Sequence, residues 1–111
     1  AHHKLDNLVV IVDNNKICAT GRTKDVLNVE PLQLKWNAFG WMVRHVDGHD
    51  PDQLFLAIEN RGSRRRKPLV IIADTVKGKG VSFMQNKLLY HYQKVDDETY
   101  KLALEELNGK K

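Results

Sequence analysis

Two uninterrupted apolar runs of strand length, LVVIV at residues 8–12 and LVIIA at 69–73, most constrain how this chain can fold. Strands that are buried on both faces, as in a parallel sheet covered by helices, have this composition. A third strand-like segment, WMVRHV, covers residues 41–46. We therefore predict a sheet with strands near residues 8–13, 41–46 and 69–74.

Helix signals lie between and after these segments. The first pattern opens at Pro31 and stops at Gly40, a residue that suits the position after a helix. The second starts with Asp50 as its N-cap and is predicted to reach about Arg61. A third amphipathic pattern covers residues 96–107.

This alternation of strands and helices predicts the fold class. It implies an α/β protein with a mostly parallel sheet, right-handed crossovers and helices on both faces, which is a three-layer α/β/α arrangement. Residues 13–30 are polar and have no clear period, so we expect them to be irregular. The chain shows no internal repeat or linker, and we predict one partial domain over residues 1–111.

Composition excludes several classes of protein. No apolar run is long enough for a membrane span, and the start AHHKLDN lacks the apolar region of a signal peptide. The single cysteine, Cys18, excludes an internal disulfide and suits the cytoplasm. The net charge of +4 is concentrated in RGSRRRK at residues 61–67, which is more typical of a solvated loop than of a nucleic-acid site.

Polar segments follow all three predicted strands: DNNKI after the first, DGHD after the second and DTVKGKG after the third. Ligands bind beyond the carboxyl ends of strands in open parallel sheets, so these segments are expected to meet at one edge. Asn14 and Asn15 offer amide oxygens that suit Mg²⁺ or Ca²⁺, although both residues are also common in turns. The KGKG stretch could cradle a phosphate or form a plain surface turn.

The histidines give weaker signals. His45 lies inside a predicted strand, where packing is the expected role, and His49 precedes a helix cap. His91 lies in a loop between Tyr90 and Tyr92, where a functional role is open. None of the five histidines has metal-ligand spacing with another on a single element.

Five segments in order resemble the N-terminal subunit of split-chain transketolases, in the later half of the diphosphate-binding (PP) domain. The segments are HKLDNLVVIVDNNKI, GRTKDV, KWNAFGWMVRHVDGHD, KPLVIIADTVKGKGVSFM and DDETYKLALEEL. This resemblance implies thiamine diphosphate and Mg²⁺ as cofactors. It implies that Asn15 binds the metal and the cofactor, and that Ile17 gives its backbone carbonyl to the metal. His91 matches a histidine that contacts the donor sugar and the cofactor, which makes it the candidate catalytic residue.

The resemblance also implies what is lacking. The family's signature opens with Gly-Asp-Gly, whose aspartate is a further metal ligand, and no Gly-Asp-Gly precedes Asn14 here. Tyr92 stands where the family has glycine, and Thr20 stands where it often has aspartate. The glutamate that activates the cofactor lies on a separate pyrimidine-binding (Pyr) domain.

We therefore expect part of a transketolase that moves a two-carbon ketol unit between sugar phosphates and is inactive as an isolated chain. Its partners would be a Pyr-domain subunit or the missing N-terminal half, in a homo- or hetero-oligomer. Two alternatives remain open. The chain could be a noncatalytic α/β module that associates with a partner chain, or part of a related thiamine-diphosphate sugar-phosphate synthase, which VDGHD and TVKGKG also resemble.

Overall fold

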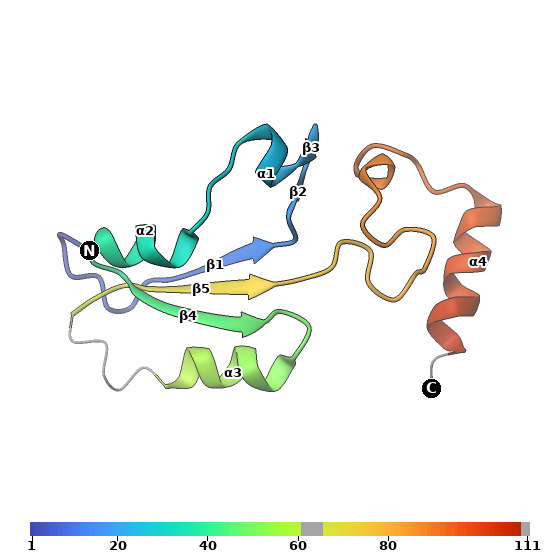
Figure 1. Ribbon diagram of the computed structural model, residues 1–111. Coiled ribbons are helices and arrows are strands. Elements are labelled where there is room, and N and C mark those ends of the chain that lie inside the picture. The colour runs from blue at the N-terminus through green and yellow to red at the C-terminus, as the bar shows by residue number, and fades with distance from the viewer. Residues whose placement is uncertain (61–65, 110–111) are drawn as a thin grey trace. The chain divides into compact units, whose positions relative to one another are not determined.

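A computed structural model describes residues 1–60 and 66–109, which form two compact units (Figure 1). Unit 1 contains residues 1–15 and 28–75, and unit 2 contains residues 16–27 and the chain from Val76 onward. Each unit is described by itself. The elements of unit 1 are β1 (Val9–Asn14), α2 (Leu32–Ala38), β4 (Met42–Asp47), α3 (Pro51–Glu59) and β5 (Leu69–Asp74). Those of unit 2 are β2 (Ile17–Cys18), β3 (Gly21–Arg22), α1 (Thr23–Val26), the 3₁₀ helix η2 (Leu88–His91) and α4 (Asp97–Asn108).

Unit 1 is a parallel three-stranded sheet with helices on both sides. The strand order is β1-β5-β4, and both pairings are parallel. Figure 1 shows α2 and α3 on opposite sides of this sheet. The predicted α/β class and parallel sheet are therefore confirmed, with the strands displaced by one residue from the expected bounds in β1 and β4.

The core of unit 1 lies around the central strand. All residues from Leu69 to Ala73 are buried, as the continuous apolar run predicted. On one sheet face, Leu69 and Ile71 pack with Ala57 of α3. Partly buried side chains from β1, β4 and α3 complete this cluster: Val9, Met42, Val46, Leu54 and Ile58.

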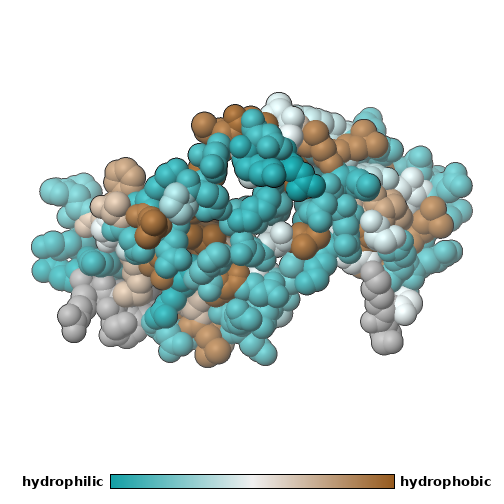
Figure 2. Space-filling model, in the orientation of Figure 1, coloured by the Kyte–Doolittle hydropathy of each residue, from teal (hydrophilic) through white to brown (hydrophobic). Residues whose placement is uncertain are grey.

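The prediction that the first strand is buried on both faces is wrong for β1. Ile11 is 54% exposed and Leu8, just before the strand, is 38% exposed. The reason is position, because β1 is an edge strand among the described residues and only β5 has a strand on either side. Figure 2 shows apolar residues among the polar ones on the molecular surface.

Two of the predicted helix signals, the Asp50 cap and the Gly40 stop, are confirmed. The Asp50 side chain caps α3 by accepting from the backbone N–H groups of Asp52 and Gln53, at 3.0 and 3.1 Å. Gly40 follows α2 with a φ of 84°, a conformation that favours glycine. α3 ends at Glu59 with Asn60 as its C-cap, two residues before the predicted end near Arg61. Most of the basic loop at 61–67 lies outside the described residues.

Unit 2 corrects the expectation for residues 13–30. This stretch contains the antiparallel pair β2–β3 and the helix α1 rather than irregular chain. Strands of two residues are too short to show a period in sequence, so the pattern was not detectable. Further along, Ser82 donates from its backbone N–H and its hydroxyl to the Glu106 carboxylate of α4. Within residues 1–60 and 66–109, no helix has the length and apolar character that a bilayer crossing requires.

Candidate functional site

The carboxyl ends of the three strands of unit 1 meet at one edge, as predicted. The register pairs Asn14 of β1 and Asp47 of β4 with Asp74 of β5. Paired residues of parallel strands project from the same face, so these three polar residues form one row across the sheet. The row lies where open α/β sheets bind ligands.

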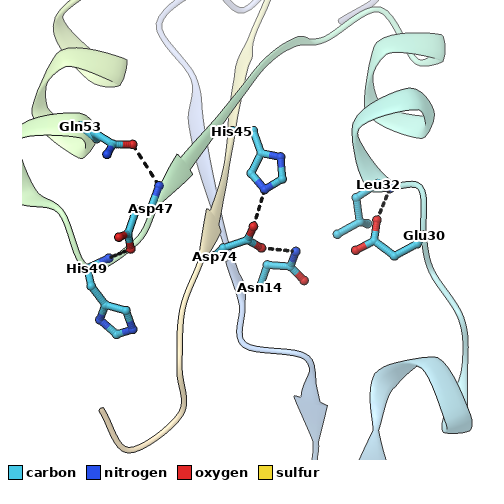
Figure 3. Close-up of polar contacts among 8 residues, drawn as sticks. All are labelled: Asn14, Glu30, Leu32, His45, Asp47, His49, Gln53 and Asp74. Carbon is cyan, nitrogen blue, oxygen red and sulfur yellow. Dashed lines mark hydrogen bonds and ion pairs between the residues drawn. The ribbon is translucent and has the colours of Figure 1, made fainter. Parts of the chain in front are cut away.

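Asp74 connects the two outer strands of this row (Figure 3). Its Oδ1 accepts from the Asn14 side-chain nitrogen at 2.9 Å, and its Oδ2 lies 2.7 Å from Nε2 of His45. The side chains of His45 and Asp74 are 48% and 47% exposed. The prediction that His45 is a packing residue is therefore wrong, because it faces solvent and an acidic partner near the end of an edge strand.

Asp13 organises the other face of β1. Its Oδ1 accepts from the Thr75 hydroxyl, and its Oδ2 accepts from the side-chain nitrogen of Asn15 at 3.2 Å. Because the Asn15 amide nitrogen donates to Asp13, the other polar atom of this amide is its oxygen, which is an acceptor. That oxygen, Oδ1 of Asn15, is the atom through which a hard cation would bind. The structure thus places the predicted metal ligand at the end of β1 with its amide held by a carboxylate.

Ile17, the other predicted metal ligand, is the first residue of β2 in unit 2, where it pairs with Arg22. The preceding residue, Lys16, has a backbone φ of 64°, which is uncommon for residues other than glycine and asparagine. The Lys16 carbonyl accepts from both the backbone N–H and the hydroxyl of Thr23. Backbone conformations of this kind concentrate at functional sites, although they do not identify a function alone.

Cys18 follows Ile17 in β2. A backbone hydrogen bond and then a side-chain hydrogen bond from Thr20 lower the pKa of the Cys18 thiol. The thiol also donates to the Gly21 carbonyl at 3.3 Å. A lowered thiol pKa raises the fraction of thiolate at neutral pH, which makes the group more reactive.

His91, the candidate catalytic residue, is the last residue of η2 in unit 2 and is exposed. Its ring lies edge-on to that of Tyr92, with 4.7 Å between centroids and 81° between planes. The residue that replaces the family's glycine therefore contacts the histidine directly.

The loop after β4 is fixed by its own polar groups (Figure 3). Asp47 accepts from the His49 backbone N–H at 2.9 Å, and its own N–H donates to the Gln53 side chain at 3.1 Å. The backbone N–H of Gln53, and then its side chain, lower the pKa of Asp50 by hydrogen bonding to the ionised carboxylate. The expectation that His49 belongs to local structure agrees with its backbone bond to Asp47.

Sequence reasoning missed His45 as a member of the edge, whereas Asp74, the first residue of DTVKGKG, was expected there. A usable signal was present, since MVRHVD places two long polar residues together before the strand end. In a strand that is buried on both faces, such a pair would leave a polar side chain in the core, which is costly. The pair therefore indicates an exposed carboxyl half of an edge strand.

The donor set of this chain suits Mg²⁺ only in part. Asn15 and a backbone carbonyl such as that of Ile17 are hard oxygen ligands, as Mg²⁺ requires. Across residues 1–60 and 66–109, however, no three His, Cys, Asp or Glu side chains are grouped so that they could hold a metal ion. Mg²⁺ usually takes one or two carboxylates together with phosphate oxygens and water.

Comparisons with known proteins identify the family. The model of the transketolase thiamine diphosphate-binding domain matches residues 1–108. A transketolase from Campylobacter jejuni has the same fold, with a TM-score of 0.85 and 30% identity, over 96% of this chain and 17% of that one. This chain therefore belongs to the transketolase thiamine diphosphate-binding domain family, and the resemblance and fold class inferred from the sequence are confirmed.

Two curated relatives have the same sequence identity to this chain. A 6-deoxy-6-sulfo-D-fructose transketolase subunit from Clostridium sp. is 41% identical over 104 residues, which are 94% of this chain and 38% of the relative. An apulose-4-phosphate transketolase subunit from Actinobacillus succinogenes is 41% identical over 107 residues, which are 96% of this chain and 38% of the relative. The chain thus spans less than half the length of the relatives that it matches.

Proposed function

We propose that this chain supplies part of the thiamine diphosphate and Mg²⁺ site of a transketolase-type enzyme that moves a two-carbon ketol unit between sugar phosphates. One observation carries the proposal. Asn15 lies at the carboxyl end of β1, and Asp13 holds its amide nitrogen, in a chain that matches the cofactor-binding domain over residues 1–108. Sugar phosphates are the substrate class, and the cytoplasm is the expected location.

Each candidate residue has a defined part in this proposal. Asn15 binds the metal through its amide oxygen, and Ile17 binds it through its backbone carbonyl. His91 orients the donor sugar and exchanges protons with its hydroxyl groups. When bound, the cofactor supplies the electron sink for carbon–carbon cleavage, while the protein supplies binding and orientation. Because both metal donors of this chain are neutral, charge compensation for Mg²⁺ must come from the diphosphate and from a carboxylate outside the described residues.

Mn²⁺, a paramagnetic substitute for Mg²⁺, tests the site because it broadens nearby NMR signals even when binding is weak. With thiamine diphosphate and Mn²⁺ added to the ¹⁵N-labelled chain, we expect selective broadening at Asn15 and Ile17. Asn15→Ala should remove it, whereas Asn37→Ala, an exposed asparagine on α2, should not. Broadening that is centred elsewhere, or that survives Asn15→Ala, would contradict the assignment.

Calorimetry and an activity assay test the incompleteness of the site. We expect undetectable or weak binding of thiamine diphosphate with Mg²⁺ to the isolated chain, and no turnover of a ketose phosphate. Submicromolar affinity, or robust turnover by the chain alone, would show that the neutral donors suffice.

A second candidate function, association with a partner chain without catalysis, is favoured by exposed apolar residues in and next to β1. Ile11 and Leu8 are both exposed, and β1 has no neighbour on its outer edge among the described residues. Unit 1 also has an apolar groove of about 410 Å³ on and beside α2, lined by Val29, Leu32, Lys35, Trp36 and Phe39. Open strand edges with apolar side chains recruit further chains.

The partner that we propose for this face is the remainder of a transketolase assembly, either a Pyr-domain subunit or the rest of the PP domain. The support is that the relatives above are named as subunits and are longer than this chain. Size-exclusion chromatography with light scattering, together with an apolar dye, tests it. A clean monomer that binds no dye would count against an interaction surface on β1.

A further inference from the structure

The polar network at the end of the sheet extends across all three strands of unit 1 (Figure 3). Asp74 of the central strand uses one carboxylate oxygen for Asn14 of β1 and the other for His45 of β4. A carboxylate with a partner on one oxygen can still turn about its terminal bond. Partners on both oxygens, from strands on either side, fix its plane.

Stability is a poor explanation for this network. The side chains of His45 and Asp74 are each about half exposed, and solvent-exposed ion pairs contribute little to folding. The geometry instead has a directional consequence. The fixed carboxylate holds the Asn14 amide by its nitrogen, one residue before the proposed metal ligand Asn15.

A second carboxylate acts on the same turn from the opposite face of β1. Asp13 is anchored by the Thr75 hydroxyl and holds the Asn15 amide, also by its nitrogen. Each of the two consecutive asparagines is therefore oriented by an aspartate that another residue holds. His45 of β4 holds Asp74, and Thr75, which directly follows β5, holds Asp13. Groups that orient ligands in this way strongly affect metal affinity in proteins.

We propose that Asp74 is a positioning residue for the Asn14–Asn15 turn, and that His45 acts through Asp74 by fixing its second oxygen. This inference rests on the proposed function, since the turn matters chemically only if Asn15 binds the metal. It assigns a role to two residues that lie outside the family's cofactor signature. His45 lies on β4, two strands away from the residue that it helps to orient.

Water exchange of the side-chain amide protons of Asn14 and Asn15, measured by NMR on the chain without cofactor or metal, tests the proposal. His45→Phe removes the ring donor and keeps an aromatic ring, whereas His45→Gln keeps an N–H donor. We expect His45→Phe to speed exchange at Asn14 by about twofold, less than the about fivefold of one lost hydrogen bond, because the bond between Asn14 and Asp74 is loosened and not removed. His45→Gln should restore the slow rate, which a role in packing alone would not require.

Asp74→Ala should speed exchange at Asn14 further and should also change the Asn15 signals. Asp47→Ala is the matched control, because Asp47 stands in register with Asp74 and bonds to the loop after β4 instead. The proposal is overturned if His45→Phe leaves Asn14 unchanged, or if Asp47→Ala has the effect expected of Asp74→Ala.

Two features keep the outcome decisive. If Asp74→Ala does not fold, the two His45 variants, which alter a half-exposed side chain, still give the answer. Since the sample contains no metal, failure of the Mn²⁺ experiment would remove the proposed function without affecting this measurement.

Discussion

Ile11 and Ile71 provide a matched pair for measuring how much of the β1 face is covered. They are the same residue type, they face each other in register on neighbouring strands, and they project from the same face of the sheet. Ile71 is fully buried against α3, whereas Ile11 is 54% exposed. Substitution of each by alanine deletes the same three carbons, so a difference in cost reports a difference in burial.

The magnitudes follow from these exposures. Three buried carbons at about 0.8 kcal/mol each give about 2.4 kcal/mol for Ile71→Ala, and the cavity left behind raises this to about 3–4 kcal/mol. At Ile11 about half of the transfer contribution applies and no closed cavity forms, so Ile11→Ala should cost about 1 kcal/mol. If Ile71→Ala unfolds the chain, Ile71→Val should cost about 1 kcal/mol and Ile11→Val less than half of that.

Urea unfolding followed by tryptophan fluorescence measures these costs in the relevant unit. Both tryptophans, Trp36 and Trp41, lie in unit 1 with their rings 4.8 Å apart, so the signal follows that unit. Equal costs at Ile11 and Ile71 would refute the exposure of the β1 face. If the cost at Ile11 then rises with protein concentration, a second copy covers this face in solution.

Three further outcomes are expected. Gly48→Ala should destabilise unit 1 by about 1–3 kcal/mol, because an added Cβ would lie 2.5 Å from Cγ2 of Thr75. Thr75→Ser removes that methyl group, keeps the hydroxyl and should recover part of the loss in a urea titration. Asp50→Ala should lower the thermal midpoint through loss of the α3 cap, and Asp50→Asn, which keeps an acceptor, should lower it less. The pKa of Asp50 is lowered in the folded chain, so its ionised carboxylate contributes fully to stability above the ordinary aspartate pKa. This contribution is lost as pH falls through the folded pKa, and the stabilities of wild type and Asp50→Ala should therefore converge in acid. Cys18 should alkylate faster at neutral pH than an unstructured cysteine peptide, and Thr20→Ala should slow the reaction, because the Thr20 hydroxyl helps to lower the thiol pKa; an unchanged rate would contradict this cause.

The sequence predicted the sheet of unit 1 well because its determinants are local. The apolar run at β5 identifies it as a strand, and the Asp50 cap fixes where α3 begins. The structure departs from expectation where burial depends on neighbours rather than on composition. Ile11 is as apolar as Ile71, and only the strand order distinguishes their environments.

The site was predicted less completely, for a related reason. Asn15 was predicted to bind a metal because amide oxygens after a strand suit a cation, and this role stays a prediction; its contact with Asp13 depends on the conformation of the turn. The contact between His45 and Asp74 joins residues 29 positions apart and depends on the register of two parallel strands. The roles of Ile17 and His91 stay predictions, since they concern a cofactor rather than contacts within the chain.

The acidic residues of this edge bear on the metal itself. Three aspartates, Asp13, Asp47 and Asp74, stand at the ends of the three strands, which would suit a cation if their oxygens were available. Each accepts hydrogen bonds from protein groups. Asp13 accepts from the Thr75 hydroxyl and an asparagine amide, and Asp47 accepts from a backbone N–H. Asp74 accepts from an asparagine amide and a histidine ring. A cation at any of them would share the carboxylate with these donors. Under the proposed function, Asp13 and Asp74 orient the Asn15 and Asn14 amides, and we expect a carboxylate outside the described residues to supply further charge that retains Mg²⁺.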